Sequence, residues 1–151
     1  MKFEKRKTKM RKFKYDVSFR VVHPNIDPDE VCNKLNMQAK YKWRVGDRRK
    51  TPKGTPLSGV YDYSYCSFLL DQFEEMELID FLKHWNKKFF NFSDFLNSIN
   101  SSGGNLEYFI GWYSKGNSGE VFDIDFLKEL VKLKISLSID FYVERSGLQS
   151  D

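Results

Sequence analysis

The two histidines and their acidic neighbours are the residues of this sequence best suited to metal or acid–base chemistry. His84 follows Asp80 by four positions, so both side chains would lie on one face of a helix and could face one metal ion. A third and fourth ligand are not evident, and a surface ion pair explains the spacing better. His23 precedes Pro24 at the end of an alternating segment. We therefore expect no metal site.

Cys32 and Cys66 are the candidate nucleophiles. A catalytic thiolate needs an exposed position, a lowered pKa and a base within reach. Cys32 falls in a predicted amphipathic helix and Cys66 in a predicted strand, where small buried side chains are common. Packing is the better interpretation of both thiols. Two cysteines cannot form a disulfide framework, which favours a reducing, cytoplasmic compartment.

Paired acids could share general acid and base work. Asp27 with Asp29, and Asp123 with Asp125, each open a predicted helix, where carboxylates cap the first turn and offset the helix dipole. No GxGxxG, Walker-type or HExxH motif occurs. The sequence therefore predicts no catalytic residue and no cofactor, and an enzyme whose site converges from distant segments stays an open alternative.

Cations interleave with aromatic rings in residues 40–50, as in proteins that stack nucleic-acid bases and neutralise phosphates. Strand alternation would instead place Tyr41 and Trp43 in the core and their cationic neighbours in solvent. For Trp112, too, a position in the core is the preferred interpretation. Tyr61, Tyr63 and Tyr65 occupy alternate positions and would form a stripe on one face of a strand. If that is the open face of the sheet, the stripe suits a protein interface. The candidate binding residues are Arg44, Arg48, Arg49, Lys50, Tyr61, Tyr63, Tyr65 and Trp112.

Charge is distributed unevenly along the chain. Its 151 residues, with a formal charge of +4, fit one domain of ordinary size. Residues 1–14 hold eight Lys and Arg against one acid, residues 40–53 hold seven against one, and the remainder holds ten against nineteen. This predicts an acidic body with a basic arm and a basic loop. No apolar stretch approaches the ~20 residues of a membrane span, and no secretory signal follows the basic N-terminus.

Hydrophobic periodicity predicts the elements that position these residues. Alternation with a period of two indicates strands at 13–22, 39–45, 60–68, 106–112 and 135–143. Helices are predicted from Asp27, over 78–89 and 92–99 with a kink or restart near 91, and from Asp123. The inward residues of the last helix are expected to be Leu127, Leu130 and Val131.

The order β-α-β-β-α-β-α-β predicts an α+β fold. We expect a five-stranded, mostly antiparallel sheet with helices packed on one face, in ferredoxin-like style. Residues 46–58 contain two glycines and two prolines and are predicted as a loop. The predicted organisation is a basic N-terminal arm over residues 1–12, a single domain over 13–144 and a loose tail over 145–151.

Three segments carry a resemblance to a known family. They are Tyr108-Phe109-Ile110-Gly111-Trp112-Tyr113, then Gly116-Asn117-Ser118-Gly119, then Ile135-Ser136-Leu137-Ser138-Ile139-Asp140-Phe141-Tyr142. With the helix start Asp27-Pro28-Asp29-Glu30-Val31, they resemble the domain-of-unknown-function 4279 (DUF4279) family over residues 13–144. The resemblance implies this architecture and a bacterial cytoplasmic setting. It gives no catalytic residues to carry over.

Two functional hypotheses follow. The first is a non-catalytic protein-interaction module, with an immunity or antitoxin-like partner protein as its specific form, which binds an unknown protein through the open sheet face and charged loops. The second is a nucleic-acid-binding protein that uses the basic arm and the 40–53 loop. Neither needs a membrane, and a second copy of the chain that covers the open face is a further alternative.

Overall fold

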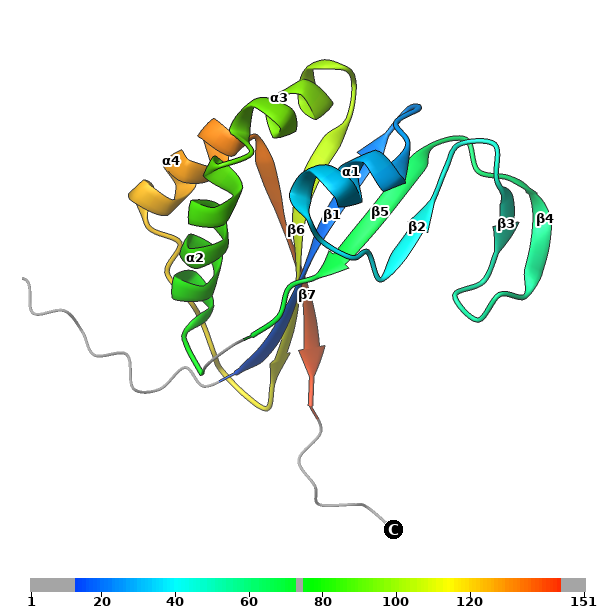
Figure 1. Ribbon diagram of the computed structural model, residues 1–151. Coiled ribbons are helices and arrows are strands. Elements are labelled where there is room, and N and C mark those ends of the chain that lie inside the picture. Colours follow the sequence, from blue (N-terminus) through cyan, green and yellow to red (C-terminus); the bar gives the residue numbers. More distant parts are fainter. Residues whose placement is uncertain (1–12, 73–74, 145–151) are drawn as a thin grey trace, which may run out of the picture.

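A computed structural model describes residues 13–72 and 75–144 of the chain. The predicted basic arm at 1–12 and the predicted tail at 145–151 lie outside the described residues. Figure 1 shows the elements within these ranges. In chain order they are β1 (Lys14–His23), α1 (Pro28–Leu35), β2 (Tyr41–Trp43), β3 (Arg48–Lys50), β4 (Pro56–Val60), β5 (Ser64–Leu69), α2 (Leu78–Phe90), α3 (Ser93–Ser101), β6 (Asn105–Ser114), α4 (Ile124–Leu133) and β7 (Ile135–Val143).

A mixed sheet of five strands, in the order β2-β5-β1-β6-β7, forms the centre of the fold. β1 pairs antiparallel with β5 and β6, β2 pairs antiparallel with β5, and β6 pairs parallel with β7. The α+β class and the five-stranded sheet are confirmed. The parallel pair makes the sheet mixed, because the crossover through α4 returns the chain in the same direction. The ferredoxin-like ordering is not confirmed.

The helices begin where the sequence supplies capping groups. Asp27 accepts a hydrogen bond from the main-chain nitrogen of Asp29 at 2.9 Å, and Asp123 accepts one from that of Phe126 at 2.8 Å. Both predicted caps are therefore confirmed. The expected break near residue 91 is also present, since α2 ends at Phe90 and α3 starts at Ser93. No helix in the described ranges is long and apolar enough to cross a membrane.

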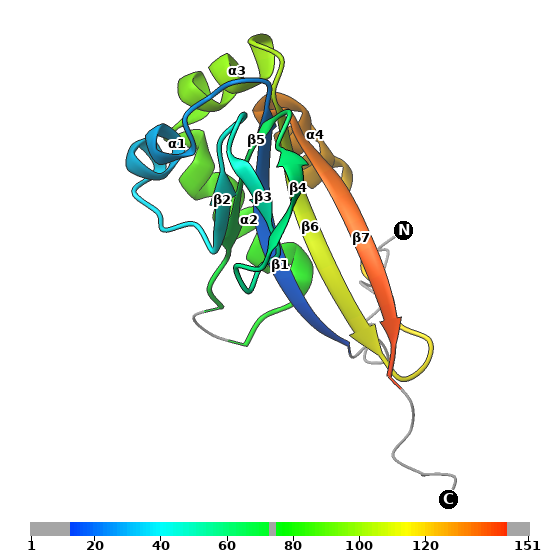
Figure 2. The ribbon, with the colours of Figure 1, turned by 90° about the vertical axis from the view of Figure 1, so that its right-hand side faces the viewer.

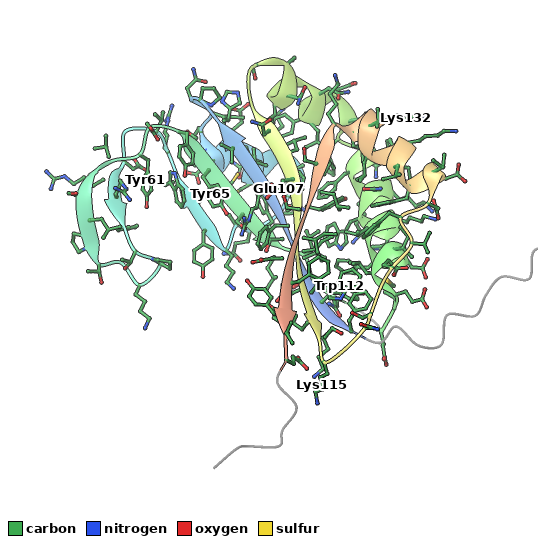
Figure 3. The ribbon with its side chains drawn as sticks, turned by 180° about the vertical axis from the view of Figure 1, so that it is seen from behind. Tyr61, Tyr65, Glu107, Trp112, Lys115 and Lys132 are labelled. Carbon is green, nitrogen blue, oxygen red and sulfur yellow. The ribbon has the colours of Figure 1, made fainter. Side chains whose placement is uncertain are left out.

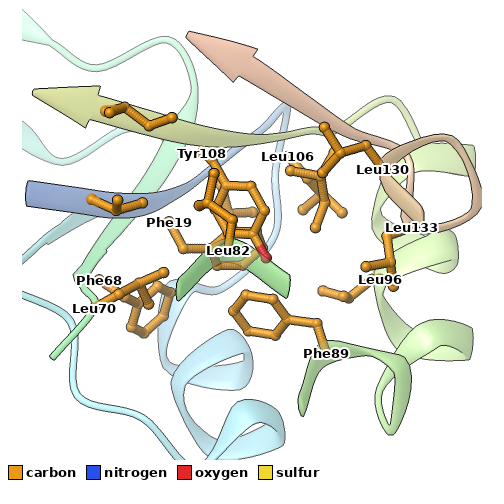
Figure 4. Packing of buried hydrophobic residues seen from close by; sticks show 14 of the residues in the cluster. Phe19, Phe68, Leu70, Leu82, Phe89, Leu96, Leu106, Tyr108, Leu130 and Leu133 are labelled. Atoms are coloured by element: carbon orange, nitrogen blue, oxygen red, sulfur yellow. The ribbon is translucent and has the colours of Figure 1, made fainter. Parts of the chain in front are cut away.

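The hydrophobic core lies between the sheet and the helices (Figure 4). Phe19 of β1 stands opposite Phe68 of β5 and Tyr108 of β6, and its ring packs 4.4 Å from that of Phe89 in α2. Tyr108 is fully buried, and its hydroxyl donates a hydrogen bond of 2.7 Å to Asn86. The buried hydroxyl of Tyr108 therefore has a buried hydrogen-bond partner on α2.

The predicted loop at 46–58 and the predicted strand at 60–68 need correction. β3 and β4 form a separate two-stranded hairpin beyond the β2 edge of the sheet (Figure 1). The chain then changes partner, because Tyr61 still exchanges main-chain hydrogen bonds with residues beside β3, whereas Ser64 pairs with β1. One alternating stretch thus spans two strands. Alternation reports which side chains share a face and does not show where a strand changes neighbour.

The last helix has a different inward face from the one expected. Leu130 is buried as predicted, but Leu127 and Val131 are 40% and 75% exposed. Phe126 and Leu133 take the inward positions instead. The sequence of α4 carries two apolar stripes, and the one that contains the larger Phe126 ring faces the sheet because it buries more apolar area.

Candidate functional site

One face of the sheet is left open by the helices (Figures 1 and 3). Side chains on this face alternate with core residues along each strand. The largest polar and aromatic side chains on the open face are Lys14, Asp16, Arg20, Tyr41, Trp43, Tyr65, Glu107, Phe109, Tyr113, Asp140 and Tyr142. They come from all five strands, so the face can present one continuous surface to a partner.

An aromatic column stands on the open face at the β2 edge. Trp43 stacks between Tyr61, with ring centroids 4.2 Å apart, and Tyr65, at 4.4 Å, and Tyr63 meets it edge-on at 5.9 Å. We call these four side chains the Tyr–Trp column. The structure thus brings together the three predicted tyrosines. It adds Trp43, which the sequence analysis had assigned to the core.

The predicted core position of Tyr41 and Trp43 is wrong. Tyr41 is 41% exposed, and both residues lie on the open face beside β5. The intervening Lys42 points to the helix side instead, where its ammonium group lies 2.6 Å from the carboxylate of Asp29 in α1. That contact raises the pKa of Lys42. At this outermost strand the helix side is partly solvated, so the lysine occupies it and the rings take the other face.

The Tyr–Trp column anchors the β3–β4 hairpin. The hydroxyl of Tyr61 donates a hydrogen bond to the carbonyl of Lys50 at 3.0 Å and accepts one from its N–H at 3.3 Å. The main chain of Tyr61 also accepts from Gly46 at 2.8 Å and donates to Asp47 at 2.9 Å. A ring, a hydroxyl and two main-chain contacts therefore fix the hairpin to the edge of the sheet.

Four cations project from this anchored hairpin. Arg48, Arg49, Lys50 and Lys53 are all exposed, and within the described ranges none forms an ion pair. The guanidinium of Arg49 donates only to the carbonyl of Ser58, at 3.3 Å. We call residues 48–60 the basic hairpin. Its charges are uncompensated and preorganised, which is the arrangement that attracts an acidic partner.

Arg44 does not belong to this group. Its guanidinium lies 3.6 Å from the carboxylate of Asp27, at the N-terminus of α1. Arg44 therefore faces the helix side while the basic hairpin extends beyond the sheet edge. The structure brings together three of the four predicted cations and separates this one.

A stacked cation occupies the middle of the open face. The guanidinium of Arg20 lies 3.6 Å from the centre of the Phe109 ring and 3.7 Å from the carboxylate of Glu107. Glu107 also accepts a hydrogen bond of 2.8 Å from Ser138. Arg20 and Glu107 occupy the polar positions of two alternating strands, and no local sequence pattern indicates that they meet. Only the pairing of those strands shows that they meet.

Two aspartates and two tyrosines surround Gly111 at the other end of this face. Tyr113 donates a hydrogen bond to Asp16 at 3.2 Å and Tyr142 donates one to Asp140 at 2.6 Å, with the two rings stacked 5.0 Å apart. Burial raises the pKa of Tyr113, and the bond to Asp140 raises that of Tyr142. A Cβ on Gly111 would meet the Asp16 carboxylate and the Tyr113 ring, so a larger residue here would have to displace these side chains. This end of the face carries two carboxylates, with Lys14 of β1 beside them.

Trp112 is not available for binding. Its side chain is 3% exposed and points away from the open face, which agrees with the expectation that it lies in the core. The indole stacks 3.7 Å from Phe13 and donates a hydrogen bond of 2.8 Å to Ser118. Trp112 therefore fixes the 114–120 loop to the sheet.

Among the candidate nucleophiles and ligands, Cys66 and His23 are buried in the described part of the chain. Burial raises the pKa of the Cys66 thiol to about 12, so the thiolate form is suppressed. His23 is 5% exposed, and burial lowers its pKa. His84 meets Trp85 edge-on at 6.2 Å. Among the described residues, no group of three His, Cys, Asp or Glu side chains could hold a metal ion.

A cavity of about 750 Å³ lies where the start of β1 meets the segments before α2 and after β6. Its polar wall groups hold these segments together. Tyr15 donates a hydrogen bond of 2.7 Å to the carbonyl of Met76, and burial raises its pKa to about 12. Glu120 accepts from the main-chain nitrogen of Ile79 at 3.3 Å, and burial raises the pKa of its carboxyl. These groups have structural partners, so we assign them no chemical role.

The fold and this surface define an α+β domain with a helix-covered core and an open, charged and aromatic sheet face. The chain belongs to the family described as Domain of unknown function (DUF4279), whose model matches residues 11–144. This confirms the family resemblance of the sequence. No curated protein and no solved structure matches the chain.

Proposed function

We propose that this domain is a non-catalytic binding protein that recognises an acidic protein surface through its basic hairpin and the adjoining open face. The observation that carries the proposal is a hairpin anchored by Tyr61 with four exposed cations, none of which pairs with a described acidic residue. Anchoring matters because a surface that is already ordered loses less conformational entropy when it binds.

The use of the aromatic rings favours a protein partner over nucleic acid. Proteins that bind single strands stack bases on open ring faces. Here Trp43 is stacked against Tyr61 and Tyr65, and the Tyr61 hydroxyl is bonded to the hairpin. The Tyr–Trp column therefore supports the surface and leaves the cations to make the contacts. Arginine is well suited to this because it pairs with a carboxylate through two parallel hydrogen bonds.

The layout of charge also supports a directional contact. The charges run from the basic hairpin, beyond the β2 edge, through the Arg20–Glu107 pair on the open face to Asp16 and Asp140, with Lys14 beside them. A partner with the opposite sequence of charges would bind in one orientation, because the reversed orientation brings like charges together. As the biological setting we propose the bacterial cytoplasm, with an immunity or antitoxin-like role. The free thiols Cys32 and Cys66 are compatible with that compartment.

The test is capture from a lysate of the source cell with immobilised full-length protein. Charge reversal at Arg48→Glu, Arg49→Glu and Lys50→Glu should abolish recovery of an acidic protein partner. A matched variant with Lys87→Glu, Lys128→Glu and Lys132→Glu carries the same charge change on exposed helix positions and should recover it unchanged. Both variants retain residues 1–12, so a difference in recovery between them does not come from the arm.

Nuclease and salt separate the competing outcomes. A protein partner survives nuclease treatment, whereas nucleic acid is digested and its affinity falls steeply with salt concentration. Recovery of nuclease-sensitive material that depends on the hairpin would assign the surface to nucleic acid. Equal recovery by the two charge-reversed variants, or recovery of nothing by the native protein, would show that the hairpin is not the binding surface.

A further inference from the structure

In the described part of the chain, no strand pairs with the outer edge of β7. β7 is the last strand of the sheet and is nine residues long. It contains no proline and no lysine, and its one charged residue is Asp140. Natural proteins protect an exposed edge with charges, prolines, bulges or a very short strand, because unpaired main-chain groups attract another strand. The opposite edge obeys this rule, since β2 has three residues and contains Lys42.

Hydrogen-bond directions show which β7 residues present their main chain to the free edge. Ser114 pairs with Val143, and its carbonyl accepts from the N–H of Glu144 at 2.9 Å. In a parallel ladder this places the main-chain groups of the even-numbered residues toward β6. The groups of the odd-numbered residues point outward. They are Ile135, Leu137, Ile139, Phe141 and Val143, whose side chains lie on the core face.

An apolar flank of α4 lies beside this edge. Phe126, Leu130 and Leu133 face the core, and Glu129 accepts a hydrogen bond from Asn86 of α2 on one side. Helical spacing places the remaining apolar stripe on the part of α4 turned away from α2, with Leu127 toward the free edge and Ile124 and Val131 further round toward solvent. This stripe consists of Ile124, Leu127 and Val131, with exposed fractions of 65%, 40% and 75%.

α4 covers only the first part of β7. A ten-residue helix spans about 15 Å, whereas a nine-residue strand spans about 30 Å. Figure 2 shows α4 beside the start of β7, with the end of the strand extending beyond the helix. Phe141 and Val143 therefore have their core-face side chains 65% and 83% exposed. No described residue covers this apolar strip or packs on the adjoining apolar flank of α4.

We propose that a second copy of this chain pairs with β7 in antiparallel fashion about a two-fold axis at Ile139, which joins the two sheets into one. The register that results places outward-facing residues opposite one another, as antiparallel hydrogen-bonded pairs require. On the core face Ile139 meets itself, Leu137 meets Phe141, and Ile135 meets Val143. Each of these pairs is apolar.

The open face of the same register is also compatible with pairing. Ser138 would stand opposite Asp140, and Ser136 opposite Tyr142, so each cross-strand pair is polar and no like charges stand opposite one another. The sequence of β7 is therefore complementary to itself in reverse. This property selects a second copy over a strand of unrelated sequence, which would have no reason to match both faces.

The two-fold axis also brings α4 of one copy to the uncovered end of the other copy's β7. Each α4 lies over the first half of its own strand, and in antiparallel pairing that half stands beside the second half of the neighbouring strand. The stripe of Ile124, Leu127 and Val131 would then pack near Phe141 and Val143 of the second copy. A dimer thus covers both exposed apolar features at once. A stable interface buries about 800 Å² per partner, which a helix flank and a strand edge together can supply.

The first test measures mass and amide exchange on the full-length protein. Light scattering during size-exclusion chromatography should give twice the chain mass. Hydrogen exchange followed by NMR should show protected amides at Leu137, Ile139 and Phe141, in addition to the even-numbered residues bonded to β6. A monomeric mass with rapid exchange at these three amides would overturn the proposal. So would a dimeric mass with the same rapid exchange, because the copies would then meet elsewhere.

Two variants locate the interface, and one controls for added charge. Phe141→Lys and Val131→Lys change side chains that are exposed in the single chain, so each variant should keep its circular dichroism spectrum and elute as a monomer. Val60→Lys introduces the same charge on the basic hairpin at a position that is 56% exposed, and it should remain a dimer. Persistence of the dimer in both Phe141→Lys and Val131→Lys would overturn the assignment to this surface.

Discussion

The ring of His23 and the hydroxyl of Ser102 lie 2.8 Å apart and join the end of β1 to the end of α3. The other ring nitrogen, Nδ1, accepts hydrogen bonds from the main-chain N–H groups of Asn25 and Ile26, at 3.0 and 2.9 Å. The proton of the neutral ring therefore lies on Nε2 and is donated to Ser102. The Ser102 hydroxyl donates in turn to the carbonyl of Ser98 at 2.7 Å. The neutral form of His23 thus holds two segments together.

Acidification should loosen this junction. Burial lowers the pKa of His23 from its ordinary value of about 6.5, against a smaller opposing effect of Glu30. The unfolded chain then binds the proton first, so the contribution of His23 to stability is complete above about pH 6.5 and is lost as the pH falls toward the folded-state pKa. We expect the urea midpoint to fall as the pH drops below about 6.5. His23→Gln should show a flatter profile, and parallel profiles would contradict this account.

Gly104 should not tolerate a side chain. A Cβ there would lie 2.7 Å from the Ile99 side chain, 2.8 Å from the Ile99 carbonyl and 2.8 Å from the His23 ring. Gly104→Ala must displace main chain or the His23 junction, and we expect a loss of about 1–3 kcal/mol in the free energy of unfolding. Gly116→Ala is the matched control, since a Cβ there meets nothing within 4 Å. Denaturant titration of both variants should give clearly different midpoints.

Removing the Tyr61 hydroxyl should release the basic hairpin without unfolding the domain. Tyr61→Phe keeps the ring stacked on Trp43 but loses both contacts to Lys50. We expect a cost of about 0.5–1.5 kcal/mol, with faster amide exchange confined to residues 48–60. Tyr63→Phe is the control, because Tyr63 meets Trp43 edge-on and its hydroxyl has no hydrogen bond to a described residue. Equal exchange rates in the two variants would show that the hairpin is held by other contacts.

The two thiols should differ sharply in reactivity. Cys66 is 1% exposed, and burial raises its pKa to about 12, whereas Cys32 is only partly buried. At mildly alkaline pH a thiol reagent should modify Cys32 in the folded protein and reach Cys66 only after denaturant is added. In Cys32→Ala the folded protein should be almost unreactive. Rapid modification of that variant would contradict the burial of Cys66.

Local sequence signals predicted most of the layer that supports the surface. Alternation located β1, β6 and β7, and the capping residues Asp27 and Asp123 marked two helix starts. These features depend on neighbours within a few residues, so one sequence suffices to detect them. The resemblance of residues 108–142 to a known family added the correct family assignment.

The arrangement of the surface depended on contacts that local patterns do not encode. Trp43 was assigned to the wrong face because alternation separates two faces without showing which one the helices cover. Val131 was assigned inward because α4 carries two apolar stripes. The meeting of Arg20 with Phe109 and Glu107 required the pairing of β1 with β6, whose residues lie far apart in the chain. These features of the surface depend on which distant segments pair, and local sequence patterns do not encode that pairing.

The central place of β1 also constrains how the chain is made. β1 lies between β5 and β6, so one side of the first strand stays unpaired until Asn105–Ser114 has been synthesised. The core face of β1 also stays uncovered until α2 and α3 have been synthesised. A chain that emerges from its N-terminus thus carries an apolar, half-paired strand through most of its synthesis, when association with other chains is easiest. Folding of this domain is expected to be completed only after β6 has left the ribosome.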